Sequence, residues 1–189
     1  MQPVALHSDR LRLDQPVAAD AAPMYEYCQD PLFERFLTVP WPYNHSDAET
    51  FISLYIPGAW KADQEYTWVL RAPDSDDFLG VISLRAKSGS IGFWLGAPYR
   101  GNEYIPEAQR LVADWAFAEG LVNEIHWECL VGNVASARVA RKCGFTFAGT
   151  GPSRSAYRDG SHPQSWQGVL RASDDRQIKG GWPESVEQA

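Results

Sequence analysis

The stretch from residue 65 to residue 131 limits the possible folds more than any other part of the chain. It holds four strand-like segments, separated by turns, a hairpin-sized gap and one amphipathic helix. Short turns join antiparallel strands, whereas a helical crossover returns the chain parallel to the strand it left. The order of elements therefore predicts an α/β fold with a mixed, mostly antiparallel central sheet flanked by helices. The four segments are 65–71, 78–86, 90–96 and 124–131.

The helix within this stretch has clear limits in the sequence. Proline is favoured at the first helical position, so Pro106 predicts the start, and Gly120 predicts the end. Apolar residues recur between them at helical spacing, which predicts one buried stripe. The stripe consists of Ala108, Leu111, Val112, Trp115 and Ala118.

The region before residue 65 contains a short strand and at least two helices. Leu11 and Leu13 alternate with charged residues, which is typical of a strand. Asp20 is expected to cap a helix over 21–29, which should end at the proline that follows Asp30.

A loop and a second helix follow. Two prolines predict an ordered loop over 38–44 rather than a helix or strand. The spacing of Ser46 and Glu49 predicts a capping box, and the apolar residues of 51–56 then share one helical face.

The region after residue 131 predicts a helix and two further strands. Asn133 is the expected N-cap of a helix that ends at Gly144. Strands are expected over 145–149 and 165–170. We predict a single domain over residues 1–171, followed by a polar tail or loosely docked extension over 172–189.

Composition narrows the class of protein. The 189 residues fit one domain on the prior of roughly 100–200 residues per domain. The net charge of −7 argues against nucleic acid as a partner. No apolar run has the length of a membrane span, and no signal peptide is apparent, so we expect a cytoplasmic protein without a membrane partner. Three scattered cysteines and four histidines without ligand spacing predict neither disulfides nor a metal site.

Two loops lead directly into helices and could hold an anion, because free N–H groups and the helix dipole point at each loop. One spans 99–105, before Pro106, and the other is Gly132-Asn133. The helix after Asn133 carries three cations, Arg138, Arg141 and Lys142. These cations either neutralise an anionic ligand or form a solvated face, which a helix C-terminus also favours.

The residues from Asn133 to Phe145 carry a family resemblance. The pattern Asn-x-x-Ser-x-x-Val-x-x-Lys-x-Gly-Phe is similar to that of GNAT-fold acyltransferases, in the branch of the ribosomal-protein N-terminal acetyltransferases. Supporting segments are DRLRL at 9–13, IGFWL at 91–95 and YRGNEYIPEA at 99–108. The resemblance covers residues 8–171 and implies a sheet whose fourth and fifth strands splay apart.

The resemblance also implies acetyl-CoA as co-substrate and assigns roles by motif position. The N–H near Leu95 would stabilise the oxyanion, and Ser136 or Tyr157 would protonate the leaving thiolate. Trp41 and Tyr43 match the region that shapes the acceptor pocket, although core packing would explain them equally well. The residues expected to hold the coenzyme are Phe93, Trp94, Leu95, Arg100, Gly101, Asn102, Glu103, Tyr104, Ile105, Asn133, Arg138 and Lys142.

Three residues depart from the family pattern. Glu103 and Ile105 stand where the family loop has small residues, which should weaken coenzyme binding or change the path of the loop. Ser90 stands where many relatives carry a glutamate that activates the amine. Glu128 is expected at the surface or edge rather than as the base, and Cys129 as a buried structural cysteine.

These observations leave two functions open. The first is an N-acetyltransferase that acts by direct transfer on a primary amine, either a protein N-terminus or a small molecule. The second is a non-catalytic binding or sensor protein on the same scaffold, suggested by Glu103, Ile105 and Ser90. The sequence leaves a homodimer open, because the relatives include monomers and dimers.

Overall fold

The computed structural model describes residues 1–188. One eight-stranded sheet runs through the molecule in the order β1-β2-β3-β4-β5-β6-β8-β7. Every neighbouring pair is antiparallel except β5 and β6, which confirms the mixed sheet. The strands are β1 (Leu6–His7), β2 (Arg12–Asp14), β3 (Glu65–Arg71), β4 (Gly80–Arg85), β5 (Ser90–Leu95), β6 (Glu124–Leu130), β7 (Thr146–Pro152) and β8 (Gln164–Arg171).

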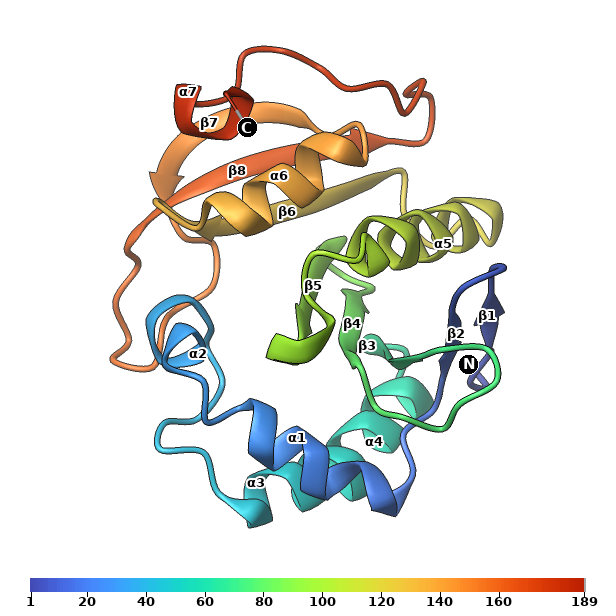
Figure 1. The fold of residues 1–189 in the computed structure, drawn as a ribbon. Coiled ribbons are helices and arrows are strands. Elements are labelled where there is room, and N and C mark those ends of the chain that lie inside the picture. Colours follow the sequence, from blue (N-terminus) through green and yellow to red (C-terminus); the bar gives the residue numbers. More distant parts are fainter. Residues whose placement is uncertain (189) are drawn as a thin grey trace.

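Helices cover both faces of the sheet. Figure 1 shows α1, α3 and α4 grouped together, away from α5 and α6. A π-helical turn, Phe51–Tyr55, joins α3 to α4. The helices are α1 (Ala21–Tyr27), α2 (Pro31–Phe36), α3 (His45–Thr50), α4 (Ile56–Lys61), α5 (Tyr104–Ala118), α6 (Val134–Lys142) and α7 (Glu184–Glu187).

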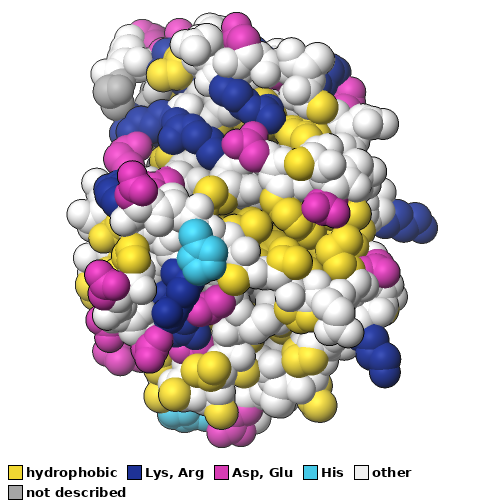
Figure 2. Space-filling model, turned by 90° about the vertical axis from the view of Figure 1, so that its right-hand side faces the viewer, with side chains coloured by type: hydrophobic (Ala, Val, Ile, Leu, Met, Phe, Trp, Pro, Cys, Tyr) yellow, Lys and Arg dark blue, Asp and Glu magenta, His cyan; other side chains and the backbone are white. Residues whose placement is uncertain are grey.

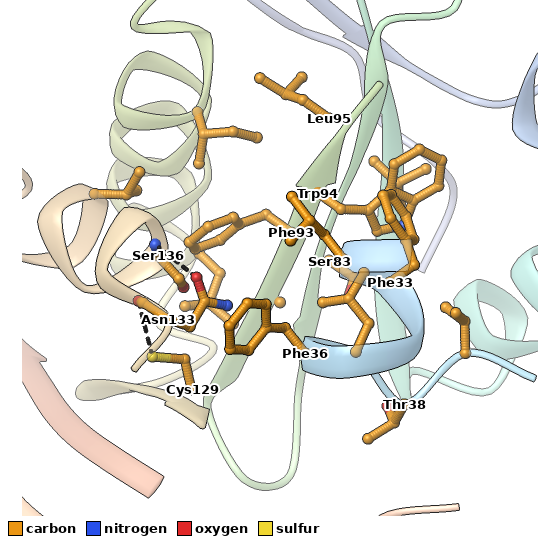
Figure 3. Close-up of a pocket in the computed structure, with 18 of the residues that line it drawn as sticks. Phe33, Phe36, Thr38, Ser83, Phe93, Trp94, Leu95, Cys129, Asn133 and Ser136 are labelled. Atoms are coloured by element: carbon orange, nitrogen blue, oxygen red, sulfur yellow. Dashed lines mark hydrogen bonds between the residues drawn. The ribbon is translucent and has the colours of Figure 1, made fainter. Parts of the chain in front are cut away.

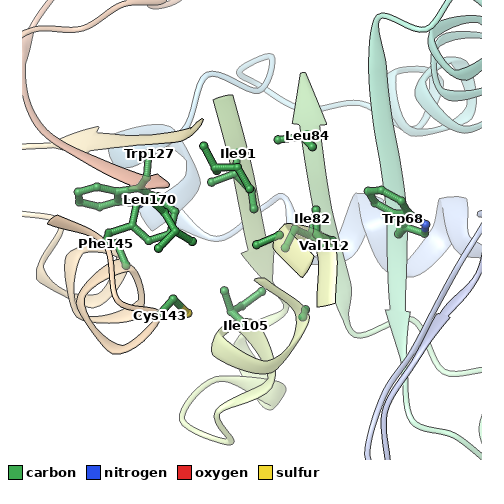
Figure 4. Packing of buried hydrophobic residues seen from close by; sticks show 14 of the residues in the cluster. Trp68, Ile82, Leu84, Ile91, Ile105, Val112, Trp127, Cys143, Phe145 and Leu170 are labelled. Carbon is green, nitrogen blue, oxygen red and sulfur yellow. The ribbon is translucent and has the colours of Figure 1, made fainter. Parts of the chain in front are cut away.

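Alternation along the strands divides the apolar side chains into two cores. On one face, Ile82 and Leu84 of β4 pack with residues of α5 and α6 (Figure 4). On the other face, Val81 packs with residues of α1, α2 and α3. We call these the α5 face and the α1 face. Successive side chains of a strand point to opposite faces, so each central strand contributes to both cores.

The α1 face also carries a buried ion pair. The Arg71 and Asp20 side chains are 3 % and 4 % exposed, and an Arg71 Nη atom lies 2.6 Å from an Asp20 carboxylate oxygen. Asp14 accepts a further bond from Arg71 Nε at 2.8 Å. The prediction that Asp20 caps α1 is therefore wrong, because the buried guanidinium takes its carboxylate and leaves no cap bond to α1.

Two other helix starts differ from the prediction. The helix predicted from Pro106 begins two residues earlier, at Tyr104. Proline is tolerated throughout the first turn, where backbone N–H groups have no intrahelical partner. The capping box of α3 lies two residues earlier than Ser46 and Glu49: the Asn44 N–H donates to the Asp47 carboxylate at 2.8 Å.

The structure adds α2, β1 and α7 to the predicted elements. Helix α1 ends at Tyr27, two residues before the predicted end, and the Asp30-Pro31 pair begins α2, with the Asp30 carboxylate accepting the Leu32 N–H at 2.9 Å. The segment after Arg171 is polar, as predicted, but it is docked: Trp182 and Val186 are 5 % and 0 % exposed and join the α5-face core.

The described residues, 1–188, contain no helix long and apolar enough to cross a membrane. On the face shown in Figure 2, Lys and Arg side chains lie beside Asp and Glu side chains rather than in one large basic field.

Candidate active site

The strands β5 and β6 diverge from a single point of contact. Their register holds only one pair, Ser90 with His126, where the His126 N–H donates to the Gly89 carbonyl at 2.8 Å. Backbone groups of alternate residues point to the same side of a strand. The N–H and C=O groups of Phe93 and Leu95 therefore face the opening, beyond the point where β6 pairs with β5.

A cavity of about 1310 Å³ occupies this opening and continues to the α1 face (Figure 3). Most of the predicted site residues line it, including Phe93, Trp94, Leu95, Arg100, Gly101, Glu103, Tyr104, Ile105, Asn133, Ser136, Arg138, Lys142, Tyr157 and Tyr43. Two predicted residues, Trp41 and Asn102, are not among its lining residues. Trp41 instead packs against the α1-face core, and the Asn102 amide donates to the Tyr99 carbonyl at 3.1 Å.

The start of α6 forms one wall of the cavity. Asn133 caps the helix as predicted, with its side-chain oxygen accepting the Ser136 N–H at 3.2 Å. The Ser136 hydroxyl oxygen accepts a bond from Trp127 Nε1 at 3.1 Å, which fixes the oxygen and leaves the hydroxyl proton free to donate. The Cys129 thiol donates to the Asn133 carbonyl at 3.5 Å (Figure 3).

Burial keeps two candidate groups protonated. Burial raises the pKa of the Cys129 thiol to about 12, although the Ser136 hydroxyl opposes the shift. Because the thiolate is the nucleophile, Cys129 is poorly suited to form an acyl-enzyme. Burial likewise raises the pKa of Tyr157 to about 12, with Cys129 and Glu128 adding to the effect. Tyr157 therefore stays a hydrogen-bond donor at neutral pH.

The loop between β5 and α5 carries the departures noted in the sequence. Glu103 has a φ of 61°, a left-handed conformation that favours glycine. Its carboxylate does not cap α5 but lies 2.6 Å from Lys142 Nζ on α6. Arg100 is also engaged, with an Nη atom 2.7 Å from the Asp30 carboxylate and Nε 3.2 Å from the Leu95 carbonyl.

The other two cations of α6 differ from Lys142. Arg138 donates to the Ser185 carbonyl at 3.2 Å and so connects α6 to α7. The Nε atom of Arg141 is buried without a hydrogen-bond partner within residues 1–188. The basic helix is therefore a set of cations in different environments rather than a uniformly solvated face.

Sequence reasoning missed the contribution of α2 to the cavity. Leu32, Phe33 and Phe36 line it, and the Tyr157 hydroxyl donates to the Phe36 carbonyl at 3.4 Å. Arg158 donates to three carbonyls after and within α2, those of Leu37 at 2.9 Å, Val39 at 3.0 Å and Glu34. The cap at Asp30 and the proline at the first helical position, Pro31, were sequence signals that could have revealed α2.

On the α1 face, Glu128 accepts two backbone N–H groups, from Arg154 at 2.9 Å and Ser155 at 3.3 Å. It therefore anchors the loop between β7 and β8. His126 also lines the cavity.

The splayed strands, the cavity between them and the capped basic helix define an acetyltransferase of the GNAT class. The acetyltransferase (GNAT) domain family matches residues 10–146, well over half of the chain, and the chain belongs to this family. Acetyl-CoA is the co-substrate of the family.

A curated relative is the probable N-acetyltransferase YjcK of Bacillus subtilis (strain 168). It is 32 % identical over 89 residues, which are 44 % of this chain and 49 % of the relative. The chain thus matches about half the length of this relative.

Solved structures share the fold at lower identity. A putative ribosomal-protein-serine acetyltransferase from Vibrio cholerae has a TM-score of 0.79 at 20 % identity, covering 90 % of this chain and 99 % of that one. The microcin C7 self-immunity acetyltransferase MccE, solved with acetyl-CoA and AMP, has a TM-score of 0.73 at 21 % identity, covering 87 % and 93 %. RimL in complex with coenzyme A has a TM-score of 0.76 at 15 % identity, covering 89 % and 98 %.

Proposed function

We propose that the chain transfers the acetyl group of acetyl-CoA to a primary amine by direct attack. The observation that carries the proposal is the edge of β5, where the backbone N–H and C=O groups of Phe93 and the N–H of Leu95 point into the cavity, while the Leu95 carbonyl already accepts from Arg100 Nε. Backbone polar groups need partners, and the amide-bearing pantetheine arm of the coenzyme would supply them. Phe93, Trp94 and Leu95 would hold this arm, as the family resemblance implies.

The same edge suits the chemistry of acyl transfer. Attack of the amine nitrogen on the thioester carbonyl places negative charge on the carbonyl oxygen, and the Leu95 N–H would stabilise it. Breaking the C–S bond then releases a thiolate. Ser136 and Tyr157 are the two candidate donors. The Ser136 oxygen already accepts from Trp127, which leaves its proton to donate. Tyr157 stays protonated and would exchange its bond to the Phe36 carbonyl for one to the thiolate.

Lys142 and Arg100 would hold the phosphates of the coenzyme. Each cation lies at the cavity and already pairs with a carboxylate of this chain, Glu103 and Asp30 respectively. Binding of a phosphate would exchange one anionic partner for another. Gly101, Tyr104 and Ile105 would complete the loop around the phosphates.

The α1-face end of the cavity is the proposed acceptor site. Its walls are largely apolar and aromatic, formed by Phe36, Leu37, Val39, Tyr43 and Phe51. This surface suits an extended peptide N-terminus or a small amine with an apolar body. The names of two structural relatives, a ribosomal-protein-serine acetyltransferase and RimL, favour the peptide.

The second candidate function is that of a non-catalytic binding protein. It is suggested because Lys142 and Arg100 already pair with carboxylates of this chain. If those pairs are too strong to exchange, the scaffold would bind another ligand without catalysis. Calorimetric titration of acetyl-CoA, with free coenzyme A as the comparison, separates the two functions. Micromolar binding supports the acetyltransferase, and absence of binding by both ligands supports the non-catalytic protein.

Turnover is tested next with a panel of amines, from short peptides with free N-termini to small aromatic amines, by following release of free thiol. No release with any amine would refute the proposed activity. Ser136→Ala and Tyr157→Phe then identify the proton donor. The variant that removes the donor should lose about 10²-fold in kcat, the lower end for acid–base catalysis, while its affinity for acetyl-CoA is unchanged.

A further inference from the structure

His126 occupies a distinctive position in the sheet. The registers of β3 to β6 place Glu65, Arg85, Ser90 and His126 side by side in one row across four strands. Neighbours in such a row project to the same face, here the α1 face, opposite to the buried Trp127. The His126 ring lines the cavity next to the short side chain of Ser90.

No neighbour engages the His126 ring closely. Its Nδ1 atom is buried without a hydrogen-bond partner within residues 1–188, and Nε2 lies 3.9 Å from the Glu124 carboxylate. Burial lowers the pKa of His126; Arg154 and Arg171 add to this effect and Glu124 opposes it. Arg85 lies beyond Ser90 in the same row and is a further cation on that face. At neutral pH the ring is therefore uncharged and has a lone pair to accept a proton.

The carboxylates that line the cavity already have hydrogen-bond or ion-pair partners. Glu128 accepts two backbone N–H groups, and Asp47 accepts one at the start of α3. Glu65 accepts the Tyr55 hydroxyl at 2.7 Å and lies 3.3 Å from Arg85. Glu103 pairs with Lys142 on the coenzyme side. Among the described carboxylate and histidine side chains around the cavity, His126 is the one that no hydrogen bond engages.

We propose that His126 is the general base of the acetyl transfer, accepting a proton from the acceptor ammonium directly or through one water. This inference rests on the proposed function. The ammonium N–H bond breaks and its proton moves to a ring nitrogen, which gives a neutral amine and an imidazolium. The amine lone pair forms the new N–C bond, the C–S bond breaks, and the second nitrogen proton ends on the coenzyme thiol.

The test compares the unaltered chain with His126→Gln, using the best amine from the panel. Glutamine is of similar size but takes no proton at these pH values. We expect kcat/KM for the amine to fall about 10²-fold at pH 8, with the dissociation constant for acetyl-CoA unchanged. The ratio of unaltered chain to variant should fall toward one as the pH drops and His126 becomes protonated. His7→Gln, on the outer strand β1, is the matched control and should match the unaltered chain.

A second variant separates loss of the base from a packing defect. Ser90→Glu in the His126→Gln background places a carboxylate in the same row, and we expect it to recover part of kcat/KM with an activity limb at lower pH. If His126→Gln keeps its activity within twofold and an unaltered pH profile, His126 is not the base and the proposed function stands. If the unaltered chain binds acetyl-CoA but acetylates no amine, the proposed function fails and the role of His126 with it.

Discussion

Removing the charge of Glu103 should tighten coenzyme binding. In the structure its carboxylate lies 2.6 Å from Lys142 Nζ, at the loop where the phosphates of acetyl-CoA are proposed to bind. Glu103→Gln frees Lys142 for the ligand and removes a negative charge from beside the phosphates. We therefore expect the variant to bind acetyl-CoA more strongly than the unaltered chain does.

The exposure of the pair limits the size of this effect. The Glu103 and Lys142 side chains are 53 % and 44 % exposed, so water screens their attraction. Exposed ion pairs are worth about 0.2–1 kcal/mol, and two unit charges 4 Å apart in bulk water interact by about 1 kcal/mol. Glu103→Gln removes both the ion pair with Lys142 and the repulsion between Glu103 and the phosphates. Together these changes favour acetyl-CoA binding by about 1–2 kcal/mol, which lowers the dissociation constant about five- to thirtyfold.

Calorimetric titration at two ionic strengths measures the effect. The gain should be larger at low salt, because the screening length falls from about 10 Å at 0.1 M to about 3 Å at 1 M. Glu119→Gln, at the opposite end of α5, removes the same charge away from the loop and serves as the control. The reasoning is refuted if Glu103→Gln binds no more tightly than Glu119→Gln, or if the gain does not depend on salt.

Glu103→Gly separates the backbone from the charge. Both Glu103→Gly and Glu103→Gln lack the ion pair, but only glycine relieves the left-handed conformation at φ 61°. A left-handed non-glycine residue costs about 1–2 kcal/mol, so the glycine variant should be the more stable of the two by about 1 kcal/mol in urea unfolding. Equal stabilities would mean that the loop holds no such strain.

Three further predictions concern stability. Asp20→Asn should cost about 3–5 kcal/mol in urea unfolding, because it leaves the buried Arg71 charge without its main partner; a cost below 1 kcal/mol would contradict this. Trp182→Ala should cost about 3–5 kcal/mol in urea unfolding, because Trp182 is 5 % exposed and belongs to the α5-face core; a cost near zero would contradict this. Burial would raise the pKa of Asp30, but the Leu32 N–H and Arg100 outweigh it and lower the pKa below its ordinary value. This stabilisation is present above about pH 3.9, the ordinary pKa, and is lost as the pH falls through the folded pKa, so Asp30→Asn should flatten the acid limb of stability.

Much of the central sheet was predictable because its signals are local. The turns and the hairpin-sized gap between strand-like segments located β3, β4 and β5, and the helical stripe of α5 located the crossover that makes β5 and β6 parallel. Asn133 and Gly144 bracket α6 because a cap and a left-handed glycine each act within one turn of the helix.

The predictions were wrong where two local patterns compete or where a residue distant in the sequence determines the contact. Asn44-x-x-Asp47 and Ser46-x-x-Glu49 have the same spacing, so the pattern could not choose between them. Asp20 is an acceptable cap in isolation, but its carboxylate accepts instead from the Val17 N–H and from Arg71, which is 51 residues away. The polar composition after residue 171 concealed two apolar side chains that complete the α5-face core.

The pairing of charges at the site also depends on residues that are distant in the sequence, and it bears on why α6 is basic. A chain with net charge −7 that binds a polyanion must supply cations locally. We propose Lys142 as one of them, but 39 residues separate it from Glu103, so no local pattern reveals that the two pair. An unpaired cation would attract any anion, whereas a paired one responds only to a ligand that binds better than the internal carboxylate does. Under the proposed function, the contribution of Lys142 to coenzyme binding is the free energy of its pair with a phosphate minus that of its pair with Glu103. A stronger pair with Glu103 therefore makes coenzyme binding weaker.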